Sequence, residues 1–317
     1  ADMGCQPHQG AGYFPVADQK IQDFYTQKYG VVHPTKAGLK IPEMFDAAIN
    51  KEIKGLWIIG EDIVQTDPNS NHVIEAMRAL DLLVVQEIFM SETAKYADVV
   101  LPGTTFLEKD GTFTNTERRV QRVNRAAVPL PGTKPDGVIV TEMMQKLGYK
   151  QKTYDADEVL AEIADVVPFF KGITRERLGK LGLQWPVKED GTDTKILHET
   201  EFKLGKGRLK SFDWKESSEI EANKNEYPLI LTTSRVLQHY NAATMTRRTN
   251  NIEMVNEDIL LVHPNDAKQR ELNTGDIARL YSGRGEVALK VEVTDKVKKG
   301  VVFTTFHFPE HMVNMVT

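Results

Sequence analysis

Between residues 51 and 102, short apolar runs alternate with a segment of helical length, and this alternation constrains the fold more than any other feature. The apolar runs are Leu56–Ile59, Leu82–Gln86 and Asp98–Pro102, and the amphipathic segment Asn71–Leu80 separates the first two. Short β-rich runs with a helix between them favour parallel strands joined by crossover connections. In open α/β sheets, ligands bind beyond the carboxyl ends of such strands. The residues that follow the first two runs are therefore the first candidates for a binding site.

The helical pattern continues after this sheet and then weakens. Apolar residues recur at helical spacing in Asp136–Leu147, and Gly148 follows where a helix C-cap is expected. The segment Asp157–Val166 is also amphipathic. From Lys171 to Asn225, glycine, proline and charged residues dilute the periodicity, so we interpret this stretch as a connector without a core.

From Tyr227 onward, the sequence pattern changes to short β-rich runs. Turn signals separate the runs, as in Ser282–Gly285, and this spacing favours a small β-barrel. We therefore expect a Rossmann-like parallel-sheet α/β domain over residues 1–150, a connector over 151–225 and a β-barrel domain over 226–317. A chain of 317 residues is about twice the commonest domain length, which also favours two domains.

Composition excludes several classes of protein. The chain is 40% hydrophobic and 27% charged, and it has no run near the roughly 20 apolar residues that a spanning helix needs, so we expect no direct membrane insertion. A net charge of -5 gives no general attraction to nucleic acid. Cys5 is the only cysteine, so the chain can form no internal disulfide and no four-cysteine iron–sulfur site.

Carboxylates follow the ends of the first two predicted strands. Gly60 permits a tight turn, and Glu61 and Asp62 offer acceptors to a ribose or a guanine edge, although a simple turn explains the tripeptide equally well. Gln86 and Glu87 add a second carboxylate at the same sheet edge, where dinucleotide riboses are commonly bound. The two strand ends together favour a ligand site.

Two further stretches are dense in hydrogen-bond donors. The segment Glu108–Arg122 carries Lys109 and several arginines that could pair with phosphates, or it is a solvated charged loop. The segment Thr233–Arg248 follows a predicted strand and concentrates hydroxyls, amides and three arginines, as expected for binding an anionic ligand. His239 lies within it, and a lone histidine is more often structural than catalytic. We expect no catalytic residue and no metal ligand in this chain.

Taken in order, these segments resemble the molybdopterin oxidoreductase superfamily, which includes dimethyl sulfoxide reductases, nitrate reductases and formate dehydrogenases. The stretch Ala1–Pro7 resembles a loop that formate dehydrogenases carry shortly after their catalytic arginine, and nitrate reductases differ at this loop. The other segments that carry the resemblance are Gly60–Asp62, Val84–Phe89, Thr93–Pro102, Glu108–Thr112, Asn115–Arg119, Lys134–Asp136, Arg235–Tyr240, Thr244–Arg248 and Phe306–Phe308.

The resemblance implies which residues contact a molybdopterin guanine dinucleotide. Gln86 and Glu87 would contact the guanine nucleoside, with Lys109 and Asp136 nearby, and the loop Thr233–Ala242 would contact the pterin and its phosphates. The full set of implied cofactor contacts is Gly60, Glu61, Asp62, Gln86, Glu87, Phe89, Thr93, Lys109, Asp136, Thr233, Arg235, Val236, Gln238, His239, Tyr240, Asn241, Phe306 and Asn314.

The resemblance also implies that the chain is the C-terminal portion of a formate dehydrogenase catalytic subunit, which oxidises formate reversibly to carbon dioxide. The implied cofactor is bis-molybdopterin guanine dinucleotide with molybdenum or tungsten, and a [4Fe-4S] cluster and the metal ligand would lie in the N-terminal remainder of the subunit. Iron–sulfur electron-transfer subunits are the expected partners, and the single cysteine fits a cytoplasmic location. The alternatives are an assimilatory nitrate reductase-like enzyme and a non-catalytic scaffold subunit that retains the fold.

Overall fold

The computed structural model describes residues 6–202 and 204–317, and the chain divides into two compact units. The first unit comprises the described residues up to Met44 together with Leu101–Leu209, and the second comprises Phe45–Val100 and Lys210–Thr317. The formate-type loop expected at Ala1–Pro7 lies largely outside the described residues. The domain limits expected from the sequence remain a prediction.

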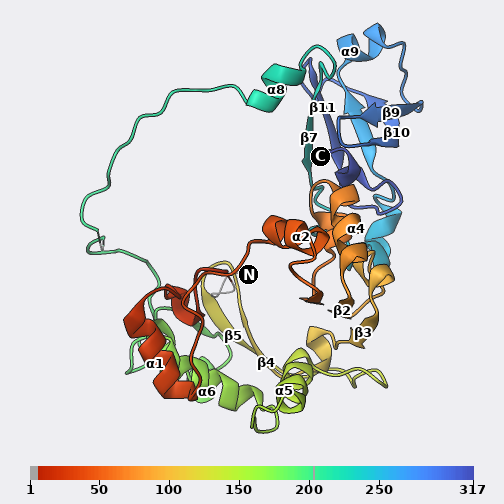
Figure 1. The fold of residues 1–317 in the computed structure, drawn as a ribbon. Helices are drawn as coiled ribbons and strands as arrows, with labels where there is room; N and C mark the ends of the chain where they lie inside the picture. The colour runs from red at the N-terminus through yellow and green to blue at the C-terminus, as the bar shows by residue number, and fades with distance from the viewer. Residues whose placement is uncertain (1–5, 203) are drawn as a thin grey trace. The chain divides into compact units, whose positions relative to one another are not determined.

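The first unit is built from helices around a small antiparallel sheet, which the ribbon in Figure 1 shows by label and colour. The sheet has the order β4-β5-β6, and both of its pairings are antiparallel. The elements that lie wholly in this unit are η1 (Ala11–Tyr13), α1 (Gln19–Tyr29), η3 (Phe106–Glu108), β4 (Gly111–Thr114), β5 (Arg119–Val123), α5 (Asp136–Lys146), α6 (Ala156–Val166), η4 (Pro168–Phe170), α7 (Arg175–Leu178) and β6 (Leu183–Gln184).

Part of the predicted connector contributes to the core of this unit. Ile173, Leu178 and Val187 are buried and pack in one cluster with residues of α6 and β5. The interpretation of Lys171–Asn225 as a stretch without a core is therefore wrong for its first part. These apolar residues are too widely spaced to produce a helical or strand period, so periodicity alone did not reveal their burial.

The second unit begins with the three-stranded sheet predicted from the alternating pattern. The strands have the order β1-β2-β3, and β1 pairs with β2 in parallel along its whole length. The elements of this part are α2 (Ile41–Ile49), β1 (Gly55–Ile59), α3 (Ile63–Thr66), α4 (Ser70–Ala79), β2 (Leu82–Glu87), η2 (Thr93–Tyr96) and β3 (Val99–Pro102), of which α2 and β3 extend across the boundary between the units. Val73 and Ala76 of α4 pack with Leu83 and Val85 of β2, which confirms the crossover helix.

The C-terminal part of the second unit is an open mixed sheet, and the expectation of a closed barrel is wrong for the residues that the structure describes. Its strand order is β7-β11-β8-β10-β9. Its elements are α8 (Ser218–Asn223), β7 (Ile230–Ser234), η5 (Thr246–Arg248), η6 (Asn250–Glu253), β8 (Ile259–Val262), α9 (Pro264–Gln269), β9 (Ile277–Tyr281), β10 (Glu286–Val293), β11 (Val301–Thr305) and η7 (Val313–Met315).

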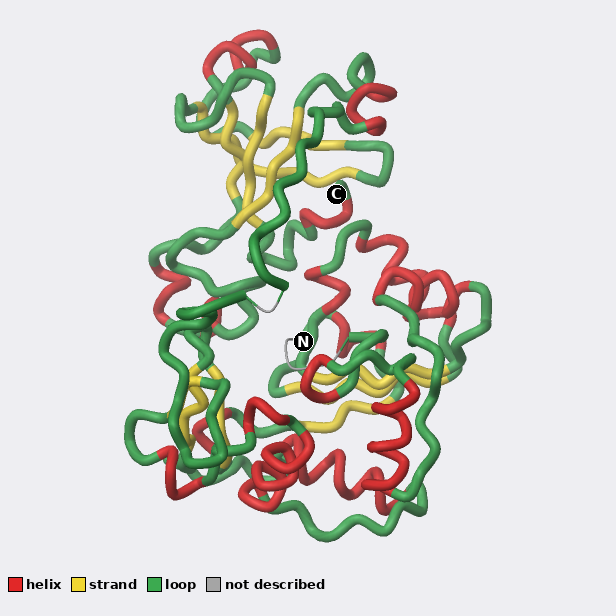
Figure 2. Tube along the Cα trace, turned by 90° about the vertical axis from the view of Figure 1, so that its left-hand side faces the viewer, coloured by secondary structure: helices red, strands yellow, loops and turns green. Residues whose placement is uncertain are grey.

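Pairing, rather than strand position, explains the difference from a barrel. All five predicted strands are present, and β9 and β10 form the expected antiparallel hairpin across the turn at 282–285. However, β10 pairs in parallel with β8, and β11 pairs in parallel with β7. Parallel neighbours interrupt the succession of hairpins that an up-and-down barrel requires. Figure 2 distinguishes these strands, in yellow, from the loops that connect them.

Candidate functional site

The strand ends of the parallel sheet lie next to each other, as the sequence predicted. The backbone N–H of Gly60 donates to the carbonyl oxygen of Gln86 at 2.9 Å, which joins the residues that follow β1 and β2. Gly60 has φ +64°, a left-handed conformation that glycine adopts at little cost. Glu61 is exposed beside it, whereas Gln86 is buried. The turn thus presents Glu61 outward.

Asp62 has a structural role inside the unit. Its side chain is only 5% exposed, and it accepts hydrogen bonds from the backbone N–H and the hydroxyl of Thr93, both at 2.8 Å. The hydroxyl oxygen of Thr93 in turn accepts from the backbone N–H of Val64 at 3.0 Å. Two predicted contact residues therefore bond to each other and fix the start of α3 against η2.

The loop after β7 is held to the end of β11 by a buried histidine. His307 Nδ1 donates to the carbonyl oxygen of Asn241 at 2.8 Å, and its Nε2 accepts from the backbone N–H of Val236 at 3.1 Å. A carbonyl can only accept and an N–H can only donate, so the ring is neutral with its proton on Nδ1. Burial lowers the pKa of His307 and favours this neutral form.

Both ring nitrogens of His239 also form hydrogen bonds. Its Nε2 donates to the carbonyl oxygen of Val255 at 2.8 Å, and its Nδ1 accepts from the hydroxyl of Thr246 at 3.0 Å. The side chain is buried. These contacts support the structural interpretation of His239 over a general base, because neither nitrogen remains available to a substrate.

A buried carboxylate that the sequence analysis missed fixes the same corner. Asp258 is 0% exposed and precedes β8. It accepts from the hydroxyl of Thr305 and from the backbone N–H groups of His307 and Phe308, the latter two at 3.1 Å. A carboxylate with several donors is well satisfied in a buried position. An isolated aspartate before an apolar run carries no distinctive sequence signal, so only the structure reveals its role.

Arginines distinguish the loop after β7 from the rest of the unit. Arg235 donates to the amide oxygen of Asn241 at 2.9 Å, and the guanidinium of Arg248 lies 4.3 Å from the ring centroid of Phe89. Arg247 is half-buried and donates to the side-chain oxygen of Gln65 at 3.1 Å. Within the described part of the chain, none of these three arginines forms an ion pair with a carboxylate. No carboxylate of the described residues therefore lies within ion-pair distance of these three cations, and the charges of Glu310, Asp62 and Glu92 act on Arg247 from farther away.

The remaining predicted residues of this unit lie around the same loop and strand ends. Thr233 is half-buried on β7, Tyr240 and Asn241 are exposed, and the carbonyl oxygen of Gln238 accepts from the side-chain amide of Asn251 at 2.5 Å. Phe306 packs at the margin of the sheet core. Asn314, buried on η7, donates to the backbone carbonyl oxygen of Gln65 at 2.7 Å.

In the first unit, the structure brings Lys109 and Asp136 together. Lys109 Nζ forms an ion pair with the carboxylate of Asp136, and both residues line a pocket of about 290 Å³. Gly137 lines the same pocket, where an added Cβ would lie 2.1 Å from Cε2 of Tyr154, so any larger residue would displace that ring. Burial raises the pKa of Tyr154, and the charge of Asp136 adds to this effect. Two residues 27 positions apart thus form one polar site.

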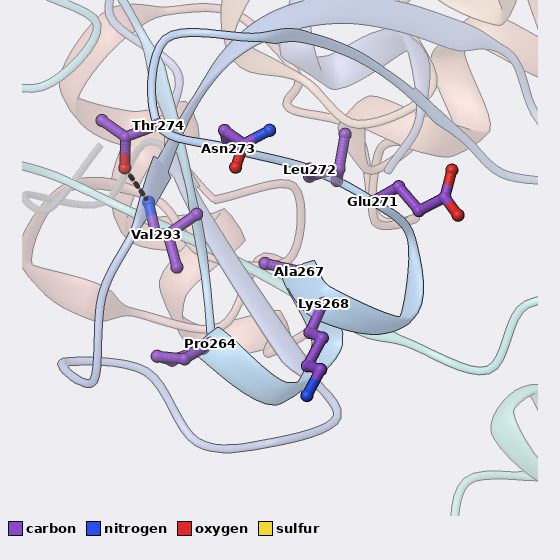
Figure 3. Close-up of a pocket in the computed structure, with 8 residues that line it drawn as sticks. All are labelled: Pro264, Ala267, Lys268, Glu271, Leu272, Asn273, Thr274 and Val293. Atoms are coloured by element: carbon purple, nitrogen blue, oxygen red, sulfur yellow. Dashed lines mark hydrogen bonds between the residues drawn. The ribbon is translucent and has the colours of Figure 1, made fainter.

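A further pocket contains no predicted site residue. It is lined by α9, by the turn 271–274 that follows this helix and by Val293 at the end of β10, with a volume of about 550 Å³. Figure 3 shows that the side chains of Lys268 and Glu271 point in different directions, while Thr274 accepts a hydrogen bond from the backbone N–H of Val293 at 3.0 Å. These side chains do not converge on a common point, so the pocket is not a candidate active site.

Over residues 6–202 and 204–317, no group of three or more histidine, cysteine, aspartate or glutamate side chains is arranged to hold a metal ion. Over the same residues, no helix combines the length and the apolar character needed to cross a membrane.

Two family models and a solved structure match parts of this chain. Residues 8–146 match the family model described as Molybdopterin oxidoreductase, and residues 229–317 match the Molydopterin dinucleotide binding domain. Acetylene hydratase from Pelobacter acetylenicus shares the fold, with a TM-score of 0.67 at 19% identity over 93% of this chain and 46% of that chain.

Curated relatives match 94–100% of this chain. The F420-dependent formate dehydrogenase subunit alpha of Methanocaldococcus jannaschii is 43% identical over 100% of this chain and 47% of its own length. The F420-dependent formate dehydrogenase 2 subunit alpha of Methanococcus maripaludis is 41% identical over the same shares. A putative formate dehydrogenase of Staphylococcus haemolyticus is 39% identical over 94% of this chain and 30% of its own length. The chain spans about half the length of the first two relatives, and it belongs to the molybdopterin oxidoreductase family.

Proposed function

We propose that this chain is the cofactor-holding C-terminal portion of a formate dehydrogenase catalytic subunit, which oxidises formate to carbon dioxide in a reversible two-electron reaction. The arginines of the loop after β7 carry the proposal. Arg235, Arg247 and Arg248 lie without a carboxylate partner in the part of the chain that the structure describes, and a dinucleotide pyrophosphate supplies the negative charge that such a loop attracts.

The donor set of this unit fits a molybdopterin guanine dinucleotide. Guanidinium groups pair with phosphate oxygens in a planar, bidentate geometry, and the hydroxyl of Thr233 and the amide of Asn241 can complete the hydrogen bonds. Glu61 and Glu87 lie at the ends of β1 and β2, where carboxylates can accept from guanine or ribose groups. By resemblance we assign the guanine nucleoside to Gln86 and Glu87 and the pyrophosphate and pterin to the loop Thr233–Ala242.

Other assigned residues act by fixing these groups rather than by touching the cofactor. Asp62 and Thr93 bond to each other, and His239 is hydrogen-bonded on both ring nitrogens, so these side chains support the neighbouring backbone of the site. The assignment of Lys109 and Asp136 as cofactor contacts rests on the resemblance. When bound, the cofactor supplies a molybdenum or tungsten centre at which formate is oxidised, and this chain supplies binding and orientation.

The relatives' names support formate as the substrate. Two of them, at 41–43% identity, are called F420-dependent formate dehydrogenase subunits alpha. The word alpha also supports the existence of partner subunits, which we propose are iron–sulfur electron-transfer proteins. We further propose a [4Fe-4S] cluster in the N-terminal remainder of this subunit. The single cysteine is consistent with a reducing cytoplasm.

Metal and pterin analysis of the full-length native protein, combined with formate-dependent dye reduction, tests the proposal. We expect molybdenum or tungsten, two pterins for each metal and dye reduction by formate. Metal and pterin without formate oxidation would indicate another reaction of the family, such as nitrate reduction. Absence of both metal and pterin would indicate a non-catalytic scaffold.

A further inference from the structure

The side chain of Gln65 lies at a junction of three segments of the second unit. It is 4% exposed on the short helix α3, directly after the strand end Gly60–Asp62. Its Nε2 lies 3.0 Å from the carbonyl oxygen of Ala242, 3.1 Å from that of His307 and 3.3 Å from that of Phe306. One amide group thus connects the strand end of the parallel sheet to the loops that follow β7 and β11.

Arg247 shares the same acceptors. Its Nη1 lies 3.1 Å from the side-chain oxygen of Gln65, 3.2 Å from the carbonyl oxygen of His307 and 3.4 Å from that of Ala242. Burial lowers the pKa of Arg247, and the neighbouring charge of Arg248 lowers it further. Gln65 therefore satisfies this half-buried cation with a neutral oxygen, which orients the guanidinium without neutralising it.

The backbone of Gln65 is held from another direction. Its carbonyl oxygen accepts from the side-chain amide of Asn314 at 2.7 Å. The residue as a whole therefore cannot move away from the loops without breaking the bond to its backbone carbonyl and the bonds of its side-chain amide. Such a residue fixes the spacing between two groups of ligand contacts, and ligand sites depend on spacing held to about half an ångström.

We propose that Gln65 is a positioning residue of the cofactor site: its amide fixes the arginine-bearing loop after β7 at a set distance from the strand end Gly60–Asp62. This inference rests on the proposed function, because it assigns the phosphates of the dinucleotide to that loop. Gln65 itself is not assigned a cofactor contact. Its role is distinct from the contacts implied by the family resemblance, which did not include it.

The test compares pterin release from full-length holoenzyme variants. Gln65→Met keeps the side-chain length but removes both the donors and the acceptor. Val73→Ala is the control for stability, because the side chain of Val73 is fully buried against the parallel sheet and can form no hydrogen bond. Thr66→Ala is the control for position, because Thr66 is the exposed neighbour on the same helix. Release is followed by the fluorescence of the freed, oxidised pterin at a temperature where every variant remains folded.

We expect Gln65→Met to release pterin about tenfold faster than the wild type, as the loss of one to two net hydrogen bonds implies, while both controls release it at the wild-type rate. A rate for Gln65→Met equal to that of Val73→Ala, at a matched melting temperature, would show a purely structural role and overturn the inference. If Gln65→Met does not fold, Gln65→Glu replaces it, because it keeps the acceptor for Arg247 but loses both donors. Wild-type release from Gln65→Glu would equally overturn the inference.

The same preparation separates this inference from the proposed function. A wild-type enzyme that contains neither metal nor pterin would refute both. A wild-type enzyme that contains the cofactor and releases it no more slowly than Gln65→Met would refute the positioning role alone.

Discussion

Lys109 in the first unit and Arg247 in the second are both cations in polar stretches of the sequence, but the structure gives them different surroundings. Lys109 pairs with the carboxylate of Asp136, and their side chains are 25% and 42% exposed. Arg247 is half-buried and bonds to neutral oxygens of Gln65, Ala242 and His307. A partly exposed ion pair contributes little to stability, whereas buried hydrogen bonds to a charge contribute more. The difference indicates that the contacts of Arg247 in the second unit are more tightly specified than the ion pair of Lys109 in the first unit.

The largest expected effect tests whether buried bonds organise the second unit. Asp258→Ala leaves the hydroxyl of Thr305 and the N–H groups of His307 and Phe308 without their acceptor, which costs about 3 kcal/mol or more. Hydrogen exchange of the amides of His307 and Phe308 should become correspondingly faster, because local opening becomes easier. Unchanged exchange at both amides would contradict the role of Asp258, and amides of β4 in the first unit provide the internal control.

A second test compares the two cations directly. Arg247→Met should weaken cofactor retention by about 2 kcal/mol, or roughly thirtyfold, because hydrogen bonds to a charged group are lost and the positive charge is removed. Lys109→Met removes a charge of the same sign from a partly exposed pair. Pterin content after dialysis measures both variants under identical conditions. An equal loss in the two variants would remove the distinction between the units.

The third test uses pH to probe the neutral ring of His307. Burial lowers its pKa below the ordinary value of 6.5, so the unfolded chain binds a proton that the folded chain does not. The stabilisation is fully present above about pH 6.5 and is lost as the pH falls below it, because protonated Nε2 can no longer accept from Val236. The melting temperature should therefore fall more between pH 7 and pH 5.5 in the wild type than in His307→Gln. Parallel curves would contradict this account.

The smallest expected effect concerns the ion pair of the first unit. A double-mutant cycle with Lys109→Met and Asp136→Asn should give a coupling energy of at most about 1 kcal/mol, because both side chains are partly exposed and solvent screens their charges. Thermal denaturation in low and high salt measures the coupling and its screening. A coupling well above this value that persists in high salt would show that the pair is more strongly desolvated than its exposure indicates.

Sequence reasoning located the secondary structure of the second unit well. The alternating pattern gave β1, α4 and β2, and the turn signals gave the five strands of the C-terminal part. Strand pairing was not predictable in the same way, because turn residues identify neighbours along the chain but not partners in space. For this reason the sequence predicted a barrel, whereas the structure has an open mixed sheet.

The candidate site was predicted for residues in polar, motif-like stretches and missed for isolated ones. Lys109 and Asp136 were predicted as cofactor contacts by resemblance, and the structure shows that they form an ion pair with each other. Gln65 and Asp258 were missed, because a single glutamine or aspartate is unremarkable in composition and acquires its role only from distant carbonyl and N–H groups. Arg247 lies in Thr244–Arg248, one of the segments that carry the family resemblance. Only the structure shows that, among the described residues, no carboxylate forms an ion pair with it.

The bonds of Gln65 also bear on the order in which the polypeptide matures. The contact with Ala242 joins residues 177 positions apart, and the contact with His307 joins residues 242 positions apart. Contacts this distant along the chain form late, because closing such long loops is entropically costly and requires the downstream residues to have been synthesised. During translation, this junction can close only after the chain up to His307 has left the ribosome, so it forms later than the parallel sheet, whose strands lie within residues 55–102.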